Sequence, residues 1–393
     1  MHIVIIGNGI SGITAARHIR KVSDHRITVI SKECEYFFSR TALMYVYMGH
    51  MKFEHTKPYE DWFWKKNRID LVYEEVKSVD PQNGSVFLNN GTTIPFDKLI
   101  IASGSRPNKS GWSGQDSKGV QGLYSKQDLE SMELFTKDIQ RAVIVGGGLI
   151  GIEMAEMLAS RNIPVTFLVR EKNFWNGVLP EEEAIMIGKH IREHHIDLHT
   201  ETNLAGILAD DKGRVSAITT DRGETVNCQF VGLTVGVSPV IDFLNNSGIE
   251  TKRGVLVNEF LETNVAGIYA IGDCAEFRKT LENRKPVEQV WYTGRMMGET
   301  VAKTICNHPT AYNPGIWFNS AKFFDIEYQT YGWVFPNLKE EEQAFYWQHP
   351  VKKISLRIHF NKLSRSINGV NVFGMRLRHK SFDQWIQEGK SIE

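Results

Sequence analysis

The sequence predicts an α/β protein with a C-terminal α+β domain, and three observations lead to this prediction. Two segments, at the start of the chain and near residue 146, each combine an apolar strand, a glycine-rich turn, a helix and a second strand. The 393 residues exceed one ordinary hydrophobic core. From Ile316 onward the chain changes to short aromatic strands without a further glycine-rich turn. We therefore expect three domains.

The first unit starts with an apolar strand over residues 2–6. The loop GNGISG follows at residues 7–12, then a helix over 13–22 and a strand over 27–30. In such a unit the glycines allow the turn, let a diphosphate approach the backbone and let the helix pack closely. The unit therefore predicts a dinucleotide site formed by Gly7, Gly9, Ile10, Ser11 and Gly12.

The second unit repeats this order, with a strand AVIV, the loop GGGLIG at residues 146–151, a helix over 152–161 and a strand over 164–169. Two units predict two Rossmann-like domains and two dinucleotides, and the economical pair is a resident FAD with a diffusing nicotinamide. The second site is predicted at Gly146, Gly148, Leu149, Ile150 and Gly151.

The remaining segments read as strands and turns. Residues 71–88 contain alternating strands with a turn at 81–84, and Asn89-Asn90-Gly91 follows as a hairpin-like turn. Residues 215–225 predict a hairpin that turns at Asp221-Arg222-Gly223. Three acidic residues after Pro180 predict the first turn of a helix, where the helix dipole favours acids.

Composition excludes several classes of protein. Lysine plus arginine equals aspartate plus glutamate, 46 against 46, so no net field attracts nucleic acid or an anionic membrane. The most apolar long window, residues 142–159, contains two glutamates and is not a membrane span. The first strand leaves no room for a signal peptide, and the four cysteines form no CxxC pair. We expect a cytoplasmic protein with inert thiols.

Four stretches in this order resemble the FAD-dependent pyridine nucleotide-disulfide oxidoreductases: VIIGNGISG, LIIASGSRP, VIVGGGLIGIE and GIYAIGDCAEF. The aromatic C-terminal strands and the absence of a CxxC pair are most similar to the branch without redox-active cysteines. That branch includes ferredoxin and rubredoxin reductases, apoptosis-inducing factor and the nitrite reductase flavoprotein. The resemblance implies an FAD domain over residues 1–112 and 245–311, an NAD(P)H domain over 113–244 and a C-terminal α+β domain over 312–393.

The resemblance also implies roles for single residues around FAD. Asp273 corresponds to a carboxylate that binds the ribityl or pyrophosphate region, and Glu33 is the candidate for a ribose hydroxyl. The helix that begins at Trp291 points its N-terminus toward the pyrimidine end of the flavin. The full set implied beside the first loop is Lys32, Glu33, Arg40, Val76, Ser103, Gly104, Asp273, Trp291 and Tyr292.

For the second nucleotide, the resemblance places Glu153 near the nicotinamide; the alternative is an acid favoured by the helix dipole. Arg170 resembles the arginine that accommodates the 2′-phosphate of NADPH, but Glu171 beside it leaves NADH open.

The stretch FFSRTALMYVY at residues 37–47 follows the first unit, and in relatives its arginine, Arg40, contacts FAD. Its aromatic rings either cover the flavin or fill the domain core. Thr41 occupies the position of the reactive cysteine in disulfide and peroxide reductases, and a hydroxyl cannot form a low-pKa thiolate. Tyr45 stands where the ferredoxin reductase pattern has a lysine near the flavin.

Two other clusters have less specific explanations. His190 and His194, with His195 and His199 behind them, offer metal ligands, but no acidic or cysteine partner lies at ligand spacing, so we expect no metal. The run Trp62, Phe63 and Trp64 is either a docking patch or part of the core, and the core is favoured.

The predicted activity is an FAD-dependent NAD(P)H oxidoreductase that passes electrons from NADPH or NADH through FAD directly to an acceptor. The acceptor is a rubredoxin- or ferredoxin-type protein, a nitrite-reducing partner or a small oxidant, and the protein is either a monomer or a homodimer. One alternative is a redox-gated interaction protein that resembles apoptosis-inducing factor, with slow flavin reoxidation. A membrane-docked quinone reductase is disfavoured, because the C-terminal SFDQWIQEGKSIE makes a poor interfacial helix.

Overall fold

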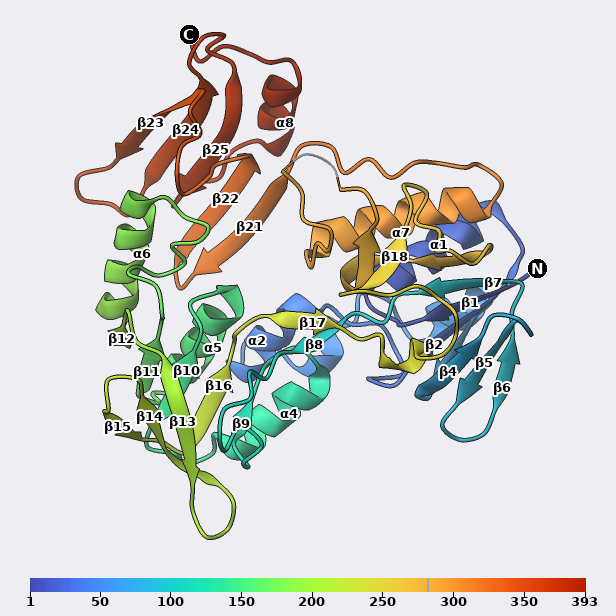
Figure 1. Cartoon of the computed structure of the whole chain (residues 1–393), viewed down its shortest axis with the longest axis horizontal. Coiled ribbons are helices and arrows are strands. Elements are labelled where there is room, and N and C mark those ends of the chain that lie inside the picture. The colour runs from blue at the N-terminus through green and yellow to red at the C-terminus, as the bar shows by residue number, and fades with distance from the viewer. Residues whose placement is uncertain (281–282) are drawn as a thin grey trace. The chain divides into compact units, whose positions relative to one another are not determined.

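The structure is a computed structural model that describes residues 1–280 and 283–393 (Figure 1). The chain divides into two compact units. Unit 1 comprises Met1–Arg106, Tyr124–Leu129 and Val237–Pro314, and unit 2 comprises Pro107–Leu123, Glu130–Gly236 and Gly315–Glu393. The boundaries of the three predicted domains remain a prediction.

Unit 1 is built on a parallel five-stranded sheet with the order β19-β7-β1-β2-β3. Residues 3–6, 27–30 and 99–101 of its inner strands are almost all apolar and are buried, as expected for a parallel sheet covered on both faces. The strands are β1 (His2–Ile6), β2 (Arg26–Ser31), β3 (Ile69–Tyr73), β7 (Lys98–Ile101) and β19 (Ile268–Ala270).

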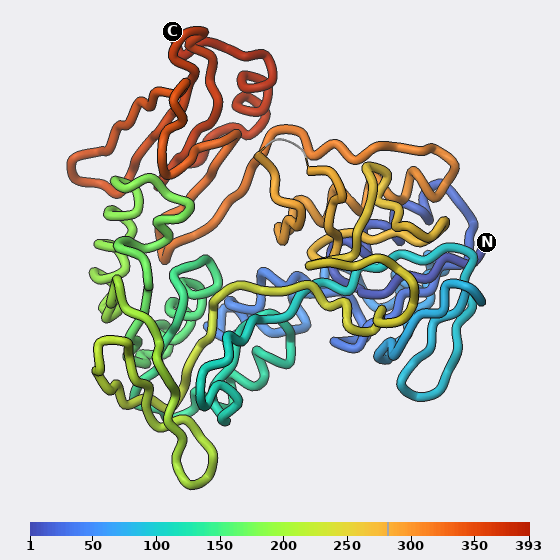
Figure 2. Tube along the Cα trace, in the orientation of Figure 1, coloured from blue at the N-terminus to red at the C-terminus, as the bar shows by residue number. Residues whose placement is uncertain are grey.

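Helices α1 (Ile10–Val22) and α7 (Trp291–Ile305) lie side by side in unit 1 (Figure 2). Their close approach depends on Gly298, where a Cβ would lie 2.6 Å from the carbonyl oxygen of Ser11. The predicted start of α1 at residue 13 is wrong by three residues, because the helix begins at Ile10, directly after its N-cap Gly9. The predicted helix at Trp291 is confirmed.

The shorter elements of unit 1 connect these parts. An antiparallel sheet contains β4 (Val76–Asp80), β5 (Ser85–Leu88) and β6 (Thr93–Pro95), which confirms the predicted turn at 81–84. In α3 (Trp62–Lys66) the Trp64 ring is buried and Phe63 packs on the core, whereas Trp62 is 60% exposed. The remaining elements are η1 (Arg40–Ala42), α2 (Leu43–Tyr47), η2 (Phe53–Thr56), β8 (Ser105–Pro107), β17 (Val237–Pro239), η3 (Asp242–Leu244), β18 (Val255–Val257), η4 (Gly272–Cys274) and β20 (Ala275–Phe277).

Unit 2 repeats the parallel architecture in a sheet of order β12-β11-β10-β16-β9. Helix α5 (Leu149–Ser160) starts behind Gly148, so the predicted start at residue 152 is also three residues late. The predicted hairpin is confirmed. The elements are β9 (Val120–Gln121), β10 (Ala142–Val145), β11 (Val165–Leu168), α6 (Glu181–Glu193), β12 (Asp197–His199), β13 (Leu204–Ala209), β14 (Val215–Thr220), β15 (Thr225–Asn227) and β16 (Phe230–Leu233). Helix α4 (Lys126–Phe135) belongs to unit 1 up to Leu129 and to unit 2 from Glu130 onward.

The C-terminal part of unit 2 is an antiparallel sheet of order β21-β22-β25-β24-β23, which completes the predicted fold class. Its strands are β21 (Phe318–Phe323), β22 (Ile326–Gly332), β23 (Glu342–Gln348), β24 (Ser355–Asn361) and β25 (Ile367–Phe373). A buried ion pair joins this sheet to α6: Arg357 on β24 donates to Glu183 at 3.2 Å. Arg357 also pairs with Glu182 at 2.6 Å, and Asn371 donates to Glu183 at 2.8 Å, so both charged groups have a second partner.

The C-terminal helix α8 (His379–Gln387) covers one face of this sheet with its apolar side chains. Phe382 and Ile386 pack against Val370 and its neighbours in β25. The apolar side of α8 therefore already has a partner within unit 2. Over the described residues, no helix has both the length and the apolar character needed to cross a membrane.

Candidate dinucleotide-binding sites

The first and third glycines of the two loops have the same geometry. Gly7 and Gly146 both have φ of +112°, a conformation that side chains of L-residues rarely adopt. A Cβ on Gly12 would lie 2.1 Å from the Gly7 carbonyl oxygen, and one on Gly151 would lie 2.4 Å from the Gly146 oxygen. Only glycine therefore fits these positions, because each helix passes directly over its own turn.

The middle glycines are different, because a Cβ at Gly9 or Gly148 would meet no atom within 4 Å. Gly9 is the N-cap of α1 and Gly148 the N-cap of α5, and neither helix has a side-chain cap or an acid in its first turn. The first N–H groups of both helices thus have no side-chain acceptor. At a helix N-terminus without a cap, the free N–H groups and the helix dipole favour an anion, and the missing side chain of the glycine lets a diphosphate approach. Both loops therefore fit a dinucleotide.

A second group of polar residues surrounds Asp273 in unit 1. The Tyr124 hydroxyl donates to Asp273 Oδ2 at 3.0 Å, and the backbone N–H of Ser105 donates to the Tyr124 oxygen at 3.0 Å. Burial raises the pKa of both side chains, and their proximity raises that of Tyr124 further. A Cβ on Gly272 would lie 2.2 Å from Ser11 Oγ, so Asp273 is held close to the start of α1.

Arg40 and Glu33, both predicted to bind FAD, form a bidentate ion pair with each other at 2.7 and 2.6 Å. Arg40 also donates to the Tyr124 carbonyl at 2.5 Å, and the Lys126 N–H donates to Glu33 at 2.9 Å. Burial, the largest single effect, lowers the pKa of Arg40, but Glu33, with smaller contributions from Tyr124 and Asp273, raises it above its ordinary value, so Arg40 is cationic. The structure therefore links Glu33, Arg40, Tyr124 and Asp273 in one network.

The aromatic stretch around Arg40 mainly fills the interior of unit 1. Phe37, Phe38 and Tyr47 are all buried, and Phe38 contacts Phe53 with ring centroids 5.1 Å apart. Tyr45 is partly exposed and stacks on His50 with centroids 6.1 Å apart. Thr41 is exposed in η1, which precedes α2. The core interpretation thus applies to three of the four rings.

The other residues predicted around FAD lie in unit 1 with varied surroundings. Ser103 donates through its hydroxyl to the Val240 carbonyl at 2.6 Å. A Cβ on Gly104 would approach the Tyr124 hydroxyl to 2.9 Å, so this glycine makes room for the tyrosine. Lys32 instead pairs with Glu75 at 2.6 Å on an exposed surface. Val76 begins β4, and Trp291 and Tyr292 form the first turn of α7.

The residues predicted for the second nucleotide lie in unit 2 at the ends of β10 and β11. Glu153 is in the second turn of α5, where burial and the neighbouring Glu156 raise its pKa to about 7. Arg170 follows β11 with 77% of its side chain exposed and pairs with Glu171 at 2.8 Å. Its guanidinium is accessible, which a 2′-phosphate would require.

The four thiols share one electrostatic property. Burial raises the pKa of Cys34 to about 11 and of Cys228 to about 12, and it also raises the pKa of Cys274 and Cys306. All four therefore stay protonated at neutral pH, and none has the environment of a reactive thiolate.

The model of the family "Pyridine nucleotide-disulphide oxidoreductase" matches residues 1–298. The chain belongs to this family. The family and fold class inferred from the four sequence stretches are confirmed. The match covers all of the residues predicted to bind either dinucleotide.

Several members of the family are similar to this chain over most of its length. Rubredoxin-NAD(+) reductase of Acinetobacter baylyi is 32% identical over 291 residues, which are 72% of this chain and 74% of that protein. Nitrite reductase [NAD(P)H] of Bacillus subtilis is 29% identical over 280 residues, but these cover only 34% of its length. The NAD-dependent persulfide reductase from A. fulgidus has the same fold, with a TM-score of 0.88 at 24% identity, and the match covers 100% of this chain and 78% of that one.

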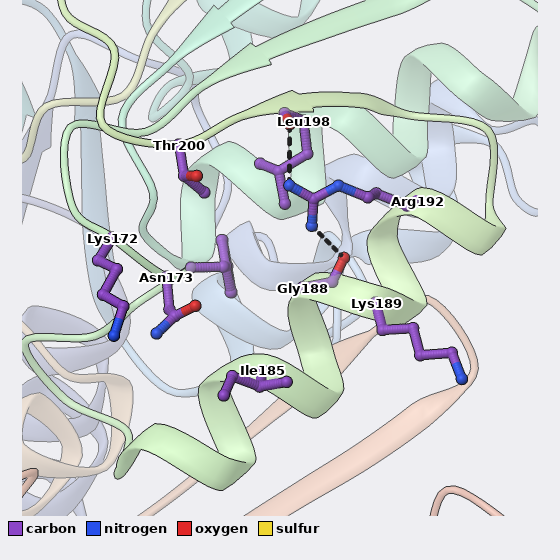
Figure 3. Close-up of a pocket in the computed structure, with 9 residues that line it drawn as sticks. Lys172, Asn173, Ile185, Gly188, Lys189, Arg192, Leu198 and Thr200 are labelled. Atoms are coloured by element: carbon purple, nitrogen blue, oxygen red, sulfur yellow. Dashed lines mark hydrogen bonds between the residues drawn. The ribbon is translucent and has the colours of Figure 1, made fainter.

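A separate cavity of about 310 Å³ lies in unit 2 between α6, β12 and the segment after β11 (Figure 3). The Arg192 guanidinium at its wall already donates to the carbonyls of Gly188 and Leu198, at 3.3 and 3.1 Å. None of the residues predicted for the two dinucleotides lines this cavity.

Sequence reasoning missed Tyr124 and Lys126. Both lie far along the chain from Glu33 and Arg40, and neither belongs to a motif with a known spacing. The only local signal was the position of Tyr124 just before a helix, where Asp128 accepts from its N–H at 2.9 Å.

Tyr124→Phe is expected to lower the free energy of unfolding by about 1 to 2 kcal/mol, because it removes an acceptor for Ser105 and a donor for Asp273. Thermal unfolding of the variant and the wild type measures the effect. The matched control is Tyr73→Phe, since Tyr73 is 60% exposed. Equal melting temperatures for the two variants would show that the Tyr124 hydroxyl contributes nothing to stability.

Proposed function

We propose that this protein is an oxidoreductase that holds FAD in unit 1 and NAD(P)H in unit 2, and that delivers the electrons of NAD(P)H directly to an acceptor. The observation that carries the proposal is the shared geometry of the two glycine loops, each with an open middle glycine below an uncapped helix. FAD, when bound, supplies the two-electron redox chemistry.

The residues of unit 1 would bind and orient FAD. The first-turn N–H groups of α1 would donate to the diphosphate at Gly9. Asp273, held by Tyr124, would accept from the ribityl chain or lie beside the pyrophosphate, and Glu33, held by Arg40, would accept from a ribose hydroxyl. The N-terminus of α7 would place its positive end at the pyrimidine edge and favour the anionic reduced state there.

The residues of unit 2 would bind the nicotinamide dinucleotide. The N–H groups at the start of α5 would donate to its diphosphate at Gly148. Glu153, with its pKa raised to about 7, would lie near the nicotinamide in a form that is partly protonated at neutral pH. Arg170 would contact the 2′-phosphate of NADPH.

We infer direct transfer to the acceptor from the side chains near Arg40. Thr41 stands at the position of a redox cysteine, and burial keeps Cys34, the closest cysteine in the sequence, protonated by raising its pKa to about 11. A disulfide relay by this route would need a thiolate.

The acceptor that we propose is a rubredoxin- or ferredoxin-type protein, with a nitrite-reducing partner or a small oxidant as the second choice. The name of the Acinetobacter relative supports the first, and that of the Bacillus relative the second. The similarities give no support to the interaction protein that resembles apoptosis-inducing factor. The homodimer and the cytoplasmic location stay predictions.

Anaerobic titration of the purified protein with NADPH and NADH tests this function. We expect the absorbance of bound FAD to bleach with one equivalent of nucleotide, and to return when oxidised rubredoxin or ferredoxin is added. If neither nucleotide bleaches the absorbance, the assignment of the second loop is wrong. If bleaching occurs but no protein carrier restores the colour, the assignment of a rubredoxin- or ferredoxin-type acceptor is wrong.

Arg170→Ala is expected to raise the apparent KM for NADPH at least about 10-fold, because a charge-assisted contact to phosphate is worth roughly 1.5 to 3 kcal/mol. The KM for NADH should change far less. The matched control is Arg222→Ala, an exposed arginine of unit 2 that donates to the Glu201 carbonyl. Equal changes of the two KM values in Arg170→Ala would contradict the role in binding the 2′-phosphate.

A further inference from the structure

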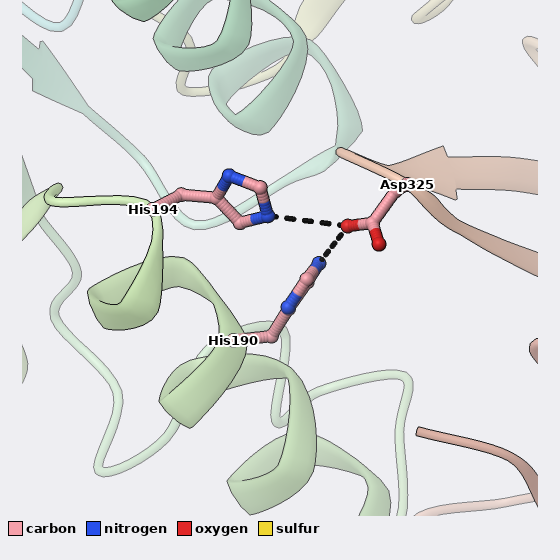
Figure 4. A group of neighbouring side chains, drawn as sticks. All are labelled: His190, His194 and Asp325. Carbon is pink, nitrogen blue, oxygen red and sulfur yellow. Dashed lines mark hydrogen bonds and ion pairs between the residues drawn. The ribbon is translucent and has the colours of Figure 1, made fainter. Parts of the chain in front are cut away.

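Two histidines from one helix and an aspartate from a distant part of the sequence meet in unit 2 as three potential metal ligands (Figure 4). His190 lies in the last turns of α6, His194 follows at the C-cap of the same helix, and Asp325 lies in the turn between β21 and β22. The nitrogen and oxygen atoms that they offer all lie within 4.8 Å of one another. The sequence offered no acidic partner for the two histidines, and the fold supplies one from 131 residues away.

The two distances that involve Asp325 are slightly shorter than those between ligands of one metal ion. Asp325 Oδ1 is 2.8 Å from His190 Nε2 and 3.1 Å from His194 Nε2. Bonds of about 2.0 to 2.2 Å around a tetrahedral zinc ion separate neighbouring ligand atoms by roughly 3.3 Å. A shift of a few tenths of an ångström by the exposed Asp325 side chain would therefore open the site to the ion.

His190 points to a ligand at this place. Its side chain is only 1% exposed, and its Nε2 lies 2.8 Å from the Asp325 carboxylate in an ion pair whose alignment is not that of a hydrogen bond. A buried ring nitrogen and a carboxylate that are this close without an aligned hydrogen bond are arranged as two ligands of one ion would be. A metal ion between His190, His194 and Asp325 would use the Nε2 lone pair.

The rings are held in place by packing rather than by the cluster itself. The His194 ring stacks on Phe324 with centroids 4.1 Å apart and planes at 4°, and the His190 ring meets Phe324 edge-on at 5.9 Å. Phe324 has φ of +54°, so the turn that carries Asp325 is itself tightly specified. The His194 side chain is partly exposed and the Asp325 side chain is largely exposed. An ion and its water ligands can therefore reach the site from solvent.

Lys353 is the group that competes with an ion. Its Nζ is 2.6 Å from His190 Nδ1, and it also pairs with Glu193. A neutral imidazole that ligates through Nε2 carries its proton on Nδ1, so the ammonium would have to turn fully toward Glu193. That carboxylate is 3.9 Å from Nδ1 and could then accept from the ring, as outer carboxylates do in zinc sites.

We propose that His190, His194 and Asp325 bind a divalent transition-metal ion, with zinc as the ion that best suits two imidazoles and one carboxylate. The ion would connect the C-terminal end of α6 to the turn between β21 and β22 and would leave at least one coordination position for water. This site is independent of the proposed electron transfer.

The test uses the untagged full chain with its bound flavin, stripped with EDTA, desalted and titrated with ZnCl₂ against a chromophoric zinc chelator. We expect one zinc ion per chain. His194→Gln and Asp325→Asn should each weaken binding more than about 10-fold, because each removes a direct ligand. Zinc should raise the melting temperature of the wild type but not of these two variants.

The matched control is His195→Asn, which changes the adjacent exposed histidine and keeps a residue that tolerates its φ of +61°. It should bind zinc like the wild type. Because His194 and Asp325 are not buried, circular dichroism should show that both variants are folded. The proposal is overturned if the wild type takes no zinc from the chelator, or if His195→Asn weakens binding as much as Asp325→Asn does.

Discussion

Gly9→Val is expected to give a folded protein that has lost its FAD. The backbone at Gly9 has φ of −69° and ψ of −177°, which valine adopts readily, and a Cβ there meets no protein atom within 4 Å. The added side chain would instead occupy the space of the diphosphate. Since two charge-assisted hydrogen bonds are each worth roughly 1.5 to 3 kcal/mol, FAD affinity should fall at least about 100-fold.

Absorbance of the purified protein measures the loss of FAD, and circular dichroism shows whether the chain is folded. Gly177→Val is the matched control, because Gly177 also has open space around it and lies outside both loops. It should retain FAD. Gly7→Ala should behave differently from both, since its Cβ would collide with the Ala102 carbonyl at 2.1 Å and prevent correct folding. If Gly9→Val is purified with a full complement of FAD, the first loop does not hold the diphosphate.

Gly148→Val is expected to leave FAD in place but to prevent its reduction by NADPH and NADH. The φ of −109° and ψ of −176° accommodate valine, and the Cβ again points into open space. The apparent affinity for both nucleotides should fall at least about 100-fold for the same reason as at Gly9. Stopped-flow bleaching of the flavin absorbance under anaerobic conditions measures this loss.

A chemical reductant such as dithionite should still bleach the Gly148→Val protein, because it needs no nucleotide site. That result would separate a lost nucleotide site from a damaged flavin site. The variants at Gly9 and Gly148 thus affect different cofactors through the same substitution. Normal bleaching of Gly148→Val by NADPH would place the nicotinamide dinucleotide elsewhere in the molecule.

The sequence was sufficient to predict both glycine loops, because their spacing reflects a local requirement. Gly7 and Gly12 are needed by the backbone of one turn, and Gly146 and Gly151 by the same turn in unit 2. The predicted starts of α1 and α5 are three residues late, because a glycine such as Gly12 normally disfavours the interior of a helix. In this protein the close approach of the helix to the turn outweighs the low helix propensity of glycine.

The parts of the site that could not be predicted depend on contacts between distant segments. Tyr124 reaches Asp273 across 149 residues, and Asp325 reaches His194 across 131. No periodicity or spacing encodes such pairs, since they arise only when whole elements pack. The ion pair between Arg40 and Glu33 is harder to predict for another reason, because both residue types are also typical ligands of a dinucleotide and the pair, seven residues apart, follows no regular repeat.

The protonated state of the cysteines affects how this protein would respond to electrophiles. With a pKa of about 11, Cys34 would be ionised in roughly one molecule in ten thousand at pH 7. The thiolate is the nucleophile that attacks alkylating agents, arsenicals and peroxide, so this protonated side chain reacts with them only slowly. Under oxidative or electrophilic stress, we therefore expect the proposed transfer of electrons from NAD(P)H to continue under conditions that inactivate an enzyme with a reactive cysteine.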